Sequence, residues 1–116
     1  MGLARELRNR RTVKANKVTV QGWADEKGKP FVMYCKPITC YDINELQKKH
    51  KAILEAPTIA AMVDMVVLKA EDEAGDKLFT SAEDRIDLMG EQTDIISDIA
   101  NQMFASIVDV EAAEKN

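Results

Sequence analysis

Hydrophobic and polar residues alternate in two short segments near the N-terminal end of the chain. The apolar positions that repeat every second residue are Val18 and Val20 in the first segment and Phe31, Met33 and Cys35 in the second. A period of two is typical of a strand with one buried face. The polar segment 25–30 between them contains Gly28 and Pro30, which favour a turn. The pattern therefore predicts a β-hairpin over residues 17–36.

Beyond the hairpin, apolar residues recur three or four positions apart, as they do on one face of a helix. This spacing predicts helices at about 40–55, 58–69, 81–89 and 91–110. Thr39 and Thr58 are suitable N-caps for the first two helices, and Pro57 ends the first. Segment 58–69 is apolar almost all round, which favours a buried central helix, but its β-branched residues also permit a strand.

These elements predict a single compact α+β domain over residues 17–110, mainly α with a small N-terminal β-hairpin and about four helices. Residues 1–16 form a basic arm that we expect to be flexible, and residues 111–116 form a polar tail. A chain of 116 residues, 46% of them hydrophobic, can bury one core. This apolar content also argues against disorder along the whole length.

The chain lacks the sequence features of a membrane or secreted protein. Its longest apolar stretch, residues 59–68, is interrupted by Asp64 and is far shorter than the ~20 residues that a spanning helix needs. Residues 1–16 carry charges where a signal peptide would have an apolar segment. We therefore expect a soluble cytoplasmic protein that does not associate with membranes.

The formal net charge of −4 conceals an uneven distribution. Residues 1–58 carry 12 Lys and Arg against 6 Asp and Glu, whereas residues 59–116 carry 4 against 14. The balances are therefore +6 and −10. Such asymmetry is compatible with two solvated faces of one domain, and also with association through charged surfaces. The candidate partner-binding cations of the basic arm are Arg5, Arg8, Arg10 and Arg11.

Metal binding and catalysis find little support in the sequence. Cys35 and Cys40 are followed by His50, but a structural zinc site usually needs a second close pair of ligands, and none is present. No glycine-rich phosphate loop or nucleophile motif occurs, and no particular pair of carboxylates stands out for acid–base chemistry. We therefore predict a protein that is not an enzyme and that has no cofactor or metal.

The acidic segment after residue 70 resembles a calcium loop only superficially. Asp72, Asp76 and Glu83 match positions one, five and twelve of an EF-hand. However, Ala74 stands where an oxygen ligand is needed, and Lys77 stands where the sharp turn needs glycine. The calcium interpretation therefore fails at two of its defining positions.

Two sets of residues are candidates for contact with a partner. A two-stranded hairpin has unpaired edges and cannot bury both faces, so aromatic side chains on it are candidate anchors. The candidate anchors are Trp23, Phe31 and Tyr34, and Tyr41 lies beside the hairpin as a further aromatic residue. An apolar stripe on the first predicted helix could dock against a partner helix. Its candidate residues are Ile43, Leu46 and His50.

A short motif follows the central apolar segment. An acidic turn around Gly75 leads into Leu78, Phe79 and Thr80, and Thr80 with Glu83 is expected to form a capping box at the start of a helix. With the early strand pair and the long final helix, this order of elements resembles the tail assembly chaperones of long-tailed bacteriophages (the lambda/HK97-like family). The resemblance covers residues 17–110.

This resemblance implies a non-enzymatic protein of the host cytoplasm that is absent from the mature virion. Such chaperones bind the tape measure protein, keep it soluble and help to recruit tail tube protein. They are often made in two lengths by a programmed ribosomal frameshift. The C-terminal residues 114–116 can be encoded GAA-AAA-AAC, which contains a slippery heptamer.

Other functions remain open at this point. The basic arm could instead serve a small nucleic-acid-binding regulatory protein, because Lys and Arg neutralise phosphates. Against this, the arm has no aromatic residues and the other half of the chain is acidic, so nucleic acid is the less favoured partner. Self-association through the oppositely charged halves is a further alternative, and a small enzyme that uses a carboxylate pair is the last.

Overall fold

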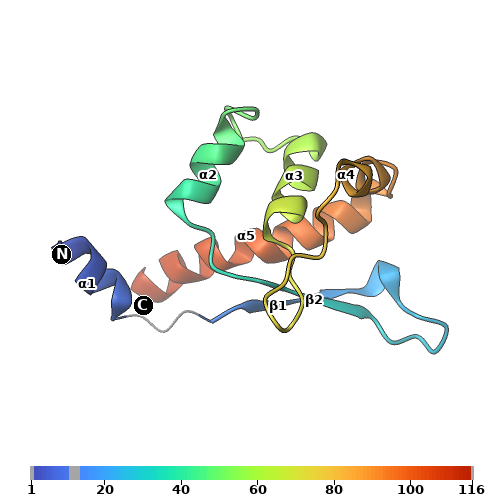
Figure 1. The fold of residues 1–116 in the computed structure, drawn as a ribbon, viewed down its shortest axis with the longest axis horizontal. Helices are drawn as coiled ribbons and strands as arrows, with labels where there is room; N and C mark the ends of the chain where they lie inside the picture. The colour runs from blue at the N-terminus through green and yellow to red at the C-terminus, as the bar shows by residue number, and fades with distance from the viewer. Residues whose placement is uncertain (1, 11–13, 116) are drawn as a thin grey trace.

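The computed structural model describes residues 2–10 and 14–115, with side chains up to residue 105 (Figure 1). In chain order its elements are α1 (Leu3–Asn9), β1 (Asn16–Val20), a 3-10 turn η1 (Gln21–Trp23), β2 (Phe31–Cys35), α2 (Cys40–Gln47), α3 (Ile59–Lys69), α4 (Ala82–Met89) and α5 (Thr93–Lys115). This confirms the predicted compact α+β domain with a small β-hairpin. The described residues contain five α-helices, where about four were expected.

β1 and β2 form the predicted antiparallel hairpin, with Val18 opposite Met33. The face that the alternation marked as apolar is buried, except that Phe31 at its end is 39% exposed. In the turn, the Asp25 carboxylate accepts hydrogen bonds from the backbone N–H groups of Lys27 and Lys29. Gly28 between them has a φ of +82°, a conformation that a residue with a Cβ rarely adopts.

Both edges of the hairpin find partners outside it, so the expectation of unpaired edges was wrong at two positions. On the β2 side, the backbone of Tyr34 exchanges two hydrogen bonds of 2.8 Å with Glu71. On the β1 side, Gln102 Nε2 donates to Thr19 O at 2.8 Å, and Thr19 N–H donates to Gln102 Oε1 at 3.0 Å. The side-chain amide of α5 thus replaces a neighbouring strand at Thr19.

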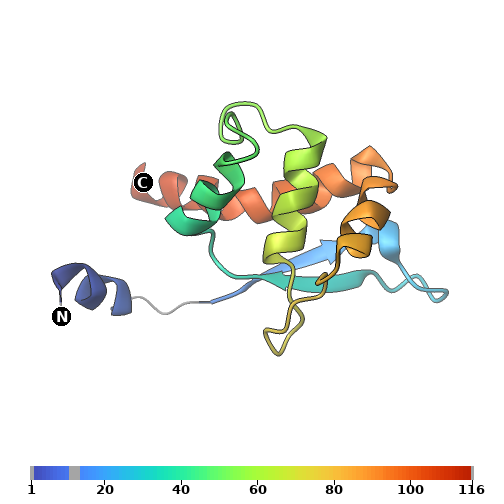
Figure 2. The same ribbon diagram turned by 45° about the horizontal axis from the view of Figure 1, so that its top comes forward.

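The buried face of the hairpin packs against α5, and α3 packs against α5 in turn. The hairpin and α5 run along the long axis of the molecule, while α2 and α3 stand across it (Figures 1 and 2). The sequence of segment 58–69 permitted either a helix or a strand. In the structure it is a central helix with Thr58 as its N-cap. Its fully buried side chains are Ala61, Val63, Met65 and Val66.

The first predicted helix is shorter than expected. Thr39 caps α2 as predicted, in a reciprocal capping box with Asp42, but the helix ends at Gln47 rather than near residue 55. Residues 48–56 form successive turns that bury Ile53 to 2% exposure. The surrounding lysines give this segment no continuous apolar face, so tertiary contacts determine its path instead of helical spacing.

The capping box of α4 lies one residue later than predicted. Ser81 accepts the N–H of Asp84, and the Asp84 carboxylate accepts the N–H groups of Ser81 and Thr80. The sequence contains two overlapping pairs at the right spacing, Thr80 with Glu83 and Ser81 with Asp84. The Asp84 carboxylate accepts hydrogen bonds from the N–H groups of Thr80 and Ser81, and the N–H of Asp84 donates to the Ser81 hydroxyl. Ser81 is therefore the N-cap of α4.

The chain ends also differ from expectation. Residues 3–9 of the predicted arm form helix α1, whose Leu3 and Leu7 stand one turn apart and are 65% and 47% exposed. Helix α5 continues through the predicted polar tail to Lys115, since residues 111–115 are good helix formers. No helix within the described part of the chain has the length and apolar content to span a bilayer.

Candidate functional site

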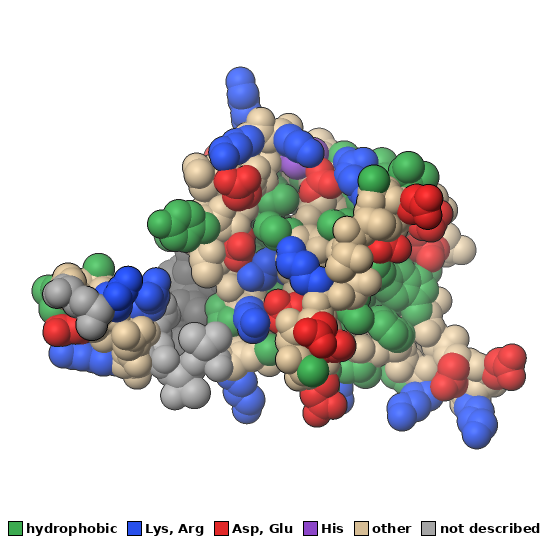
Figure 3. All heavy atoms as spheres, viewed as in Figure 1, with side chains coloured by type: hydrophobic (Ala, Val, Ile, Leu, Met, Phe, Trp, Pro, Cys, Tyr) green, Lys and Arg blue, Asp and Glu red, His purple; other side chains and the backbone are tan. Residues whose placement is uncertain are grey.

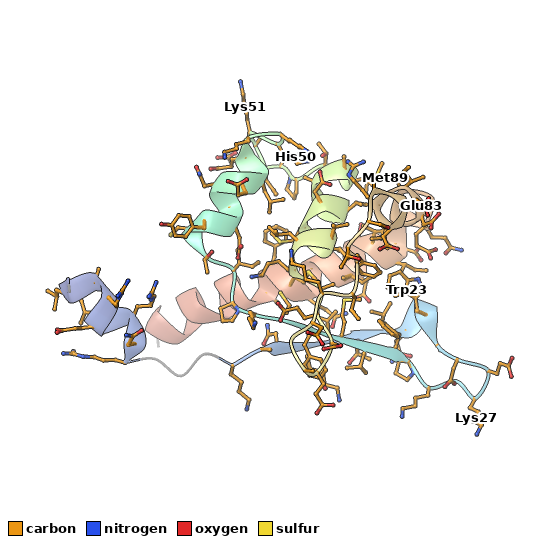
Figure 4. All side chains as sticks on the ribbon, in the orientation of Figure 1. Trp23, Lys27, His50, Lys51, Glu83 and Met89 are labelled. Atoms are coloured by element: carbon orange, nitrogen blue, oxygen red, sulfur yellow. The ribbon has the colours of Figure 1, made fainter. Side chains whose placement is uncertain are left out.

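Three aromatic side chains from distant parts of the sequence meet where the hairpin approaches α4. The Trp23 ring centroid lies 6.0 Å from that of Phe31 and 6.4 Å from that of Phe79, and the interplanar angles are 65° and 71°. Two predicted anchors thereby join a residue of the predicted motif. Figure 4 shows Trp23 beneath α4, and Figure 3 shows hydrophobic side chains gathered at this place with acidic ones beside them.

These rings line a cavity of about 390 Å³ that we call the aromatic pocket. Its full lining is Trp23, Phe31, Phe79, Asp84, Asp87, Leu88 and Glu91. The acidic residues come from α4 and the turn that follows it. Sequence reasoning missed this contribution of α4, although the i, i+3 spacing of Asp84 and Asp87 puts both on one helix face.

Hydrogen bonds hold two of the three carboxylates in their charged form. Backbone N–H groups of Thr80 and Ser81 lower the pKa of Asp84. The N–H of Gln92 and then the Trp23 indole lower the pKa of Glu91, whose Oε2 accepts from Trp23 Nε1 at 2.8 Å. This last bond also fixes the orientation of the indole ring. The pocket is therefore anionic at neutral pH.

The predicted motif before α4 is a connector that positions Phe79. Gly75 has a φ of +90° at the tip of the acidic turn, which explains the need for glycine there. Leu78 is packed against the core, and its N–H donates to Ala70 O at 3.1 Å. Tyr34, a predicted anchor, is half-buried beside this turn through its bridge to Glu71. Glu83 is exposed on α4 and lies outside the capping box.

A second hollow lies on the outer side of α2. This α2 groove has a volume of about 670 Å³ and is lined by Ile38, Thr39, Cys40, Tyr41, Ile43, Asn44, Gln47 and Leu54. Tyr41 is 83% exposed and Leu54 is 54% exposed. Of the predicted helical stripe only Ile43 lines the groove, because Leu46 is buried in the core and is 6% exposed.

From the sequence, Tyr41 was noted only as an aromatic residue beside the hairpin and Leu54 only as an apolar position of the first predicted helix, and neither was assigned to a site. Tyr41 precedes Leu46 by five positions, which places it on the other side of a 3.6-residue helix. Once Leu46 is assigned to the core, this spacing alone indicates that Tyr41 is exposed. Leu54 reaches the groove only because the chain turns after residue 47, and helical periodicity does not predict that turn.

His50 belongs to a polar cluster rather than to an apolar docking surface. Its Nε2 lies 2.7 Å from Asp64 Oδ2, and Arg85 Nε donates to Asp64 Oδ1 at 2.6 Å. Burial raises the pKa of Asp64, but the hydrogen bonds and charges of Arg85 and His50 outweigh it, so the pKa is lowered. The cluster lines a cavity of about 520 Å³ and ties the turn after α2 to α3 and α4.

The candidate zinc ligands do not converge. Cys35 is buried, and burial raises the pKa of its thiol to about 11, whereas Cys40 is exposed at the start of α2. His50 is engaged with Asp64. Among the residues described by the structure, no three His, Cys, Asp or Glu side chains are arranged to hold a metal ion.

The arginines of the N-terminal arm are separated from the other candidates. Arg5, Arg8 and Arg10 are exposed on or just after α1, and Arg11 lies outside the described residues. Helix α1 and Trp23 lie toward opposite ends of the long axis (Figures 1 and 4). The predicted partner-binding residues therefore form several surfaces instead of one site.

No protein-family model, curated protein or solved structure significantly matches this chain.

Proposed function

We propose that this protein is a non-enzymatic tail assembly chaperone of a long-tailed bacteriophage. In this role it binds the tape measure protein in the host cytoplasm, keeps it soluble, helps to recruit tail tube subunits and is absent from the mature virion. The order of sequence elements over residues 17–110 supports this proposal, as does the helical architecture.

The observation that carries the proposal is the α2 groove. A long helical client exposes apolar stripes, and its chaperone must cover them with accessible apolar surface. The groove offers such a surface, because Tyr41 and Leu54 are more than half exposed and Ile38 and Ile43 line the space between them. Tyrosine is among the residue types that contribute most binding energy at protein interfaces, which makes Tyr41 the main anchor of this groove.

Co-expression with the tape measure protein encoded beside this gene tests the proposal. We expect the tape measure protein to be soluble with this chain and to aggregate without it. Tyr41→Ser combined with Leu54→Ser should reduce the soluble yield at least several-fold, since each lost anchor weakens binding by about tenfold. Both side chains are exposed, so the melting temperature should change little.

Ile86→Ser is the matched control, because Ile86 is 66% exposed on α4 and does not line the groove. This variant should retain full chaperone activity. Equal recovery of soluble tape measure protein in the absence of the chain would contradict the proposal. So would steeply salt-dependent binding of DNA or RNA through the basic arm, which would favour the nucleic-acid-binding alternative.

A further inference from the structure

We infer that the aromatic pocket binds the guanidinium group of an arginine presented by a segment of a partner protein. The inference concerns the chemistry of the pocket and holds whatever the identity of that partner, so it is independent of the proposed chaperone function. It rests on the arrangement of the rings, the charge of the lining and the position of the chain's own cations.

The three rings form walls around the cavity. Phe31 and Phe79 stand at 65° and 71° to the Trp23 indole, so neither ring stacks flat on it. Aromatic faces carry negative potential and attract a cation that lies over them. Phe31 is 39% exposed and Trp23 and Phe79 are half-buried, so a ligand can reach these rings from solvent.

The carboxylates of the pocket have no cationic partner among the described residues. Asp84 and Glu91 accept hydrogen bonds from neutral donors only, the backbone N–H groups and the Trp23 indole. Asp87 makes no side-chain hydrogen bond or ion pair with a described residue. Arg85, the nearest cation in sequence, is bonded to Asp64 in a different cavity. Three negative charges therefore surround an apolar hollow without compensation.

This combination fits arginine better than other cations. A guanidinium is planar and weakly hydrated, so it can stack on an aromatic ring while its N–H groups donate to carboxylates at the rim. A compact ammonium group is more strongly hydrated and loses more on entering an apolar hollow. A metal ion would need several oxygen ligands around one point, whereas much of this lining is aromatic.

The arginine comes from another chain. The protein's own basic helix, α1, lies toward the far end of a molecule that measures 48 Å along its longest axis (Figures 1 and 4). Lys27 is at the hairpin turn and extends away from Trp23 (Figure 4), and it does not line the pocket. The apolar floor provided by Leu88 favours an arginine that is flanked by hydrophobic residues in the partner.

Trp23 is the single tryptophan of the chain, so its fluorescence reports on the pocket directly. The probe is a capped pentapeptide with one central arginine between two leucines. The matched ligand replaces arginine by citrulline, which has the same shape without the charge. We expect the arginine peptide to change the fluorescence saturably and the citrulline peptide to bind at least tenfold more weakly. Added salt should weaken the binding of the arginine peptide more than the binding of the citrulline peptide.

Asp87→Asn tests the role of the unpaired carboxylate. We expect this variant to bind the arginine peptide three- to tenfold more weakly, with an unchanged melting temperature because Asp87 is exposed. Asp76→Asn is the matched control, since it removes an exposed carboxylate in the acidic turn outside the pocket. It should bind like the parent protein. Trp23→Leu removes the fluorescent residue, so its binding of the arginine peptide is measured by calorimetry. This variant should lose binding while its circular dichroism spectrum stays that of the parent protein.

Equal binding of the citrulline peptide would overturn the inference, as would equal effects of Asp87→Asn and Asp76→Asn. A peptide that copies residues 2–10 distinguishes the source of the arginine. Tighter binding of that peptide than of the pentapeptide would assign the pocket to a second copy of this chain and would overturn its assignment to a separate partner.

Discussion

At the scale of single residues, Lys69 brings a charge into the junction between β2 and α2. Its Nζ lies 2.8 Å from Asp42 Oδ2 and 3.4 Å from Pro37 O, and its side chain is 10% exposed. Asp42 also accepts the N–H of Thr39, so one carboxylate caps α2 and neutralises Lys69. Burial raises the pKa of Asp42, but the bonds from Lys69 and Thr39 outweigh it and lower the pKa.

Replacing Lys69 by methionine should lower the free energy of unfolding by about 3 kcal/mol, because Asp42 would remain charged without its partner. Urea denaturation at neutral pH measures this change. Lys48→Met is the control, since its ion pair with Glu45 has the same 2.8 Å length but is exposed, and its loss should cost less than about 1 kcal/mol. Equal losses in the two variants would show that burial of the Lys69 pair is unimportant.

At the scale of elements, the start of α4 depends on which of two neighbouring hydroxyls caps it. Ser81 accepts the N–H of Asp84 at 3.1 Å, while the Thr80 hydroxyl makes no hydrogen bond to a described residue. α4 in turn carries Asp84, Asp87 and Leu88 to the aromatic pocket. The cap therefore supports the pocket as well as the helix.

Ser81→Ala should destabilise the protein by about 1 kcal/mol, the usual cost of a lost N-cap. Thr80→Ala is its neighbour and control, and it should change the stability by no more than a few tenths of that. Thermal unfolding followed by circular dichroism compares them. If Thr80→Ala were the more damaging of the two, the capping box would lie where the sequence alone had suggested.

Local chemistry explains which of these elements could be predicted. The hairpin alternation and the caps at Thr39 and Thr58 depend on neighbours a few residues away, and the structure contains each of them. The end of α2 and the meeting of Trp23 with Phe79 depend on contacts between distant segments. The exposure of side chains on α2 also depends on contacts with a distant segment. Leu46 is buried and Tyr41 is exposed because α3 packs against one side of this short helix.

At the scale of the whole molecule, Asp64 of α3 connects the turn after α2 with α4 through its bonds to His50 and Arg85. The pKa of Asp64 is lower in the folded chain than the ordinary value of about 4. The ionised carboxylate of Asp64 therefore stabilises the folded protein at pH values above about 4. This contribution is lost as the pH falls through the lower pKa that Asp64 has in the folded chain. The same direction holds for Asp42.

Asp64→Asn should lower the free energy of unfolding by about 1.5–3 kcal/mol at pH 7, the typical worth of hydrogen bonds to a charged group. The difference from the parent protein should shrink as the pH is lowered from 5 toward 3, because the parent loses the same interactions. Urea titrations at several pH values measure both curves. Asp76→Asn should keep the parent's pH dependence, and parallel curves for Asp64→Asn would refute the role of Asp64.

The two hydrogen bonds exchanged between Gln102 and Thr19, and the bridge between Glu71 and Tyr34, also matter beyond the fold. An open strand edge is a template onto which another chain can add a strand, and this is how many proteins begin to aggregate. In this hairpin the outward-facing backbone groups at Thr19 and Tyr34 are already taken. At these two positions the folded protein therefore offers no free strand edge as a seed for intermolecular β-structure.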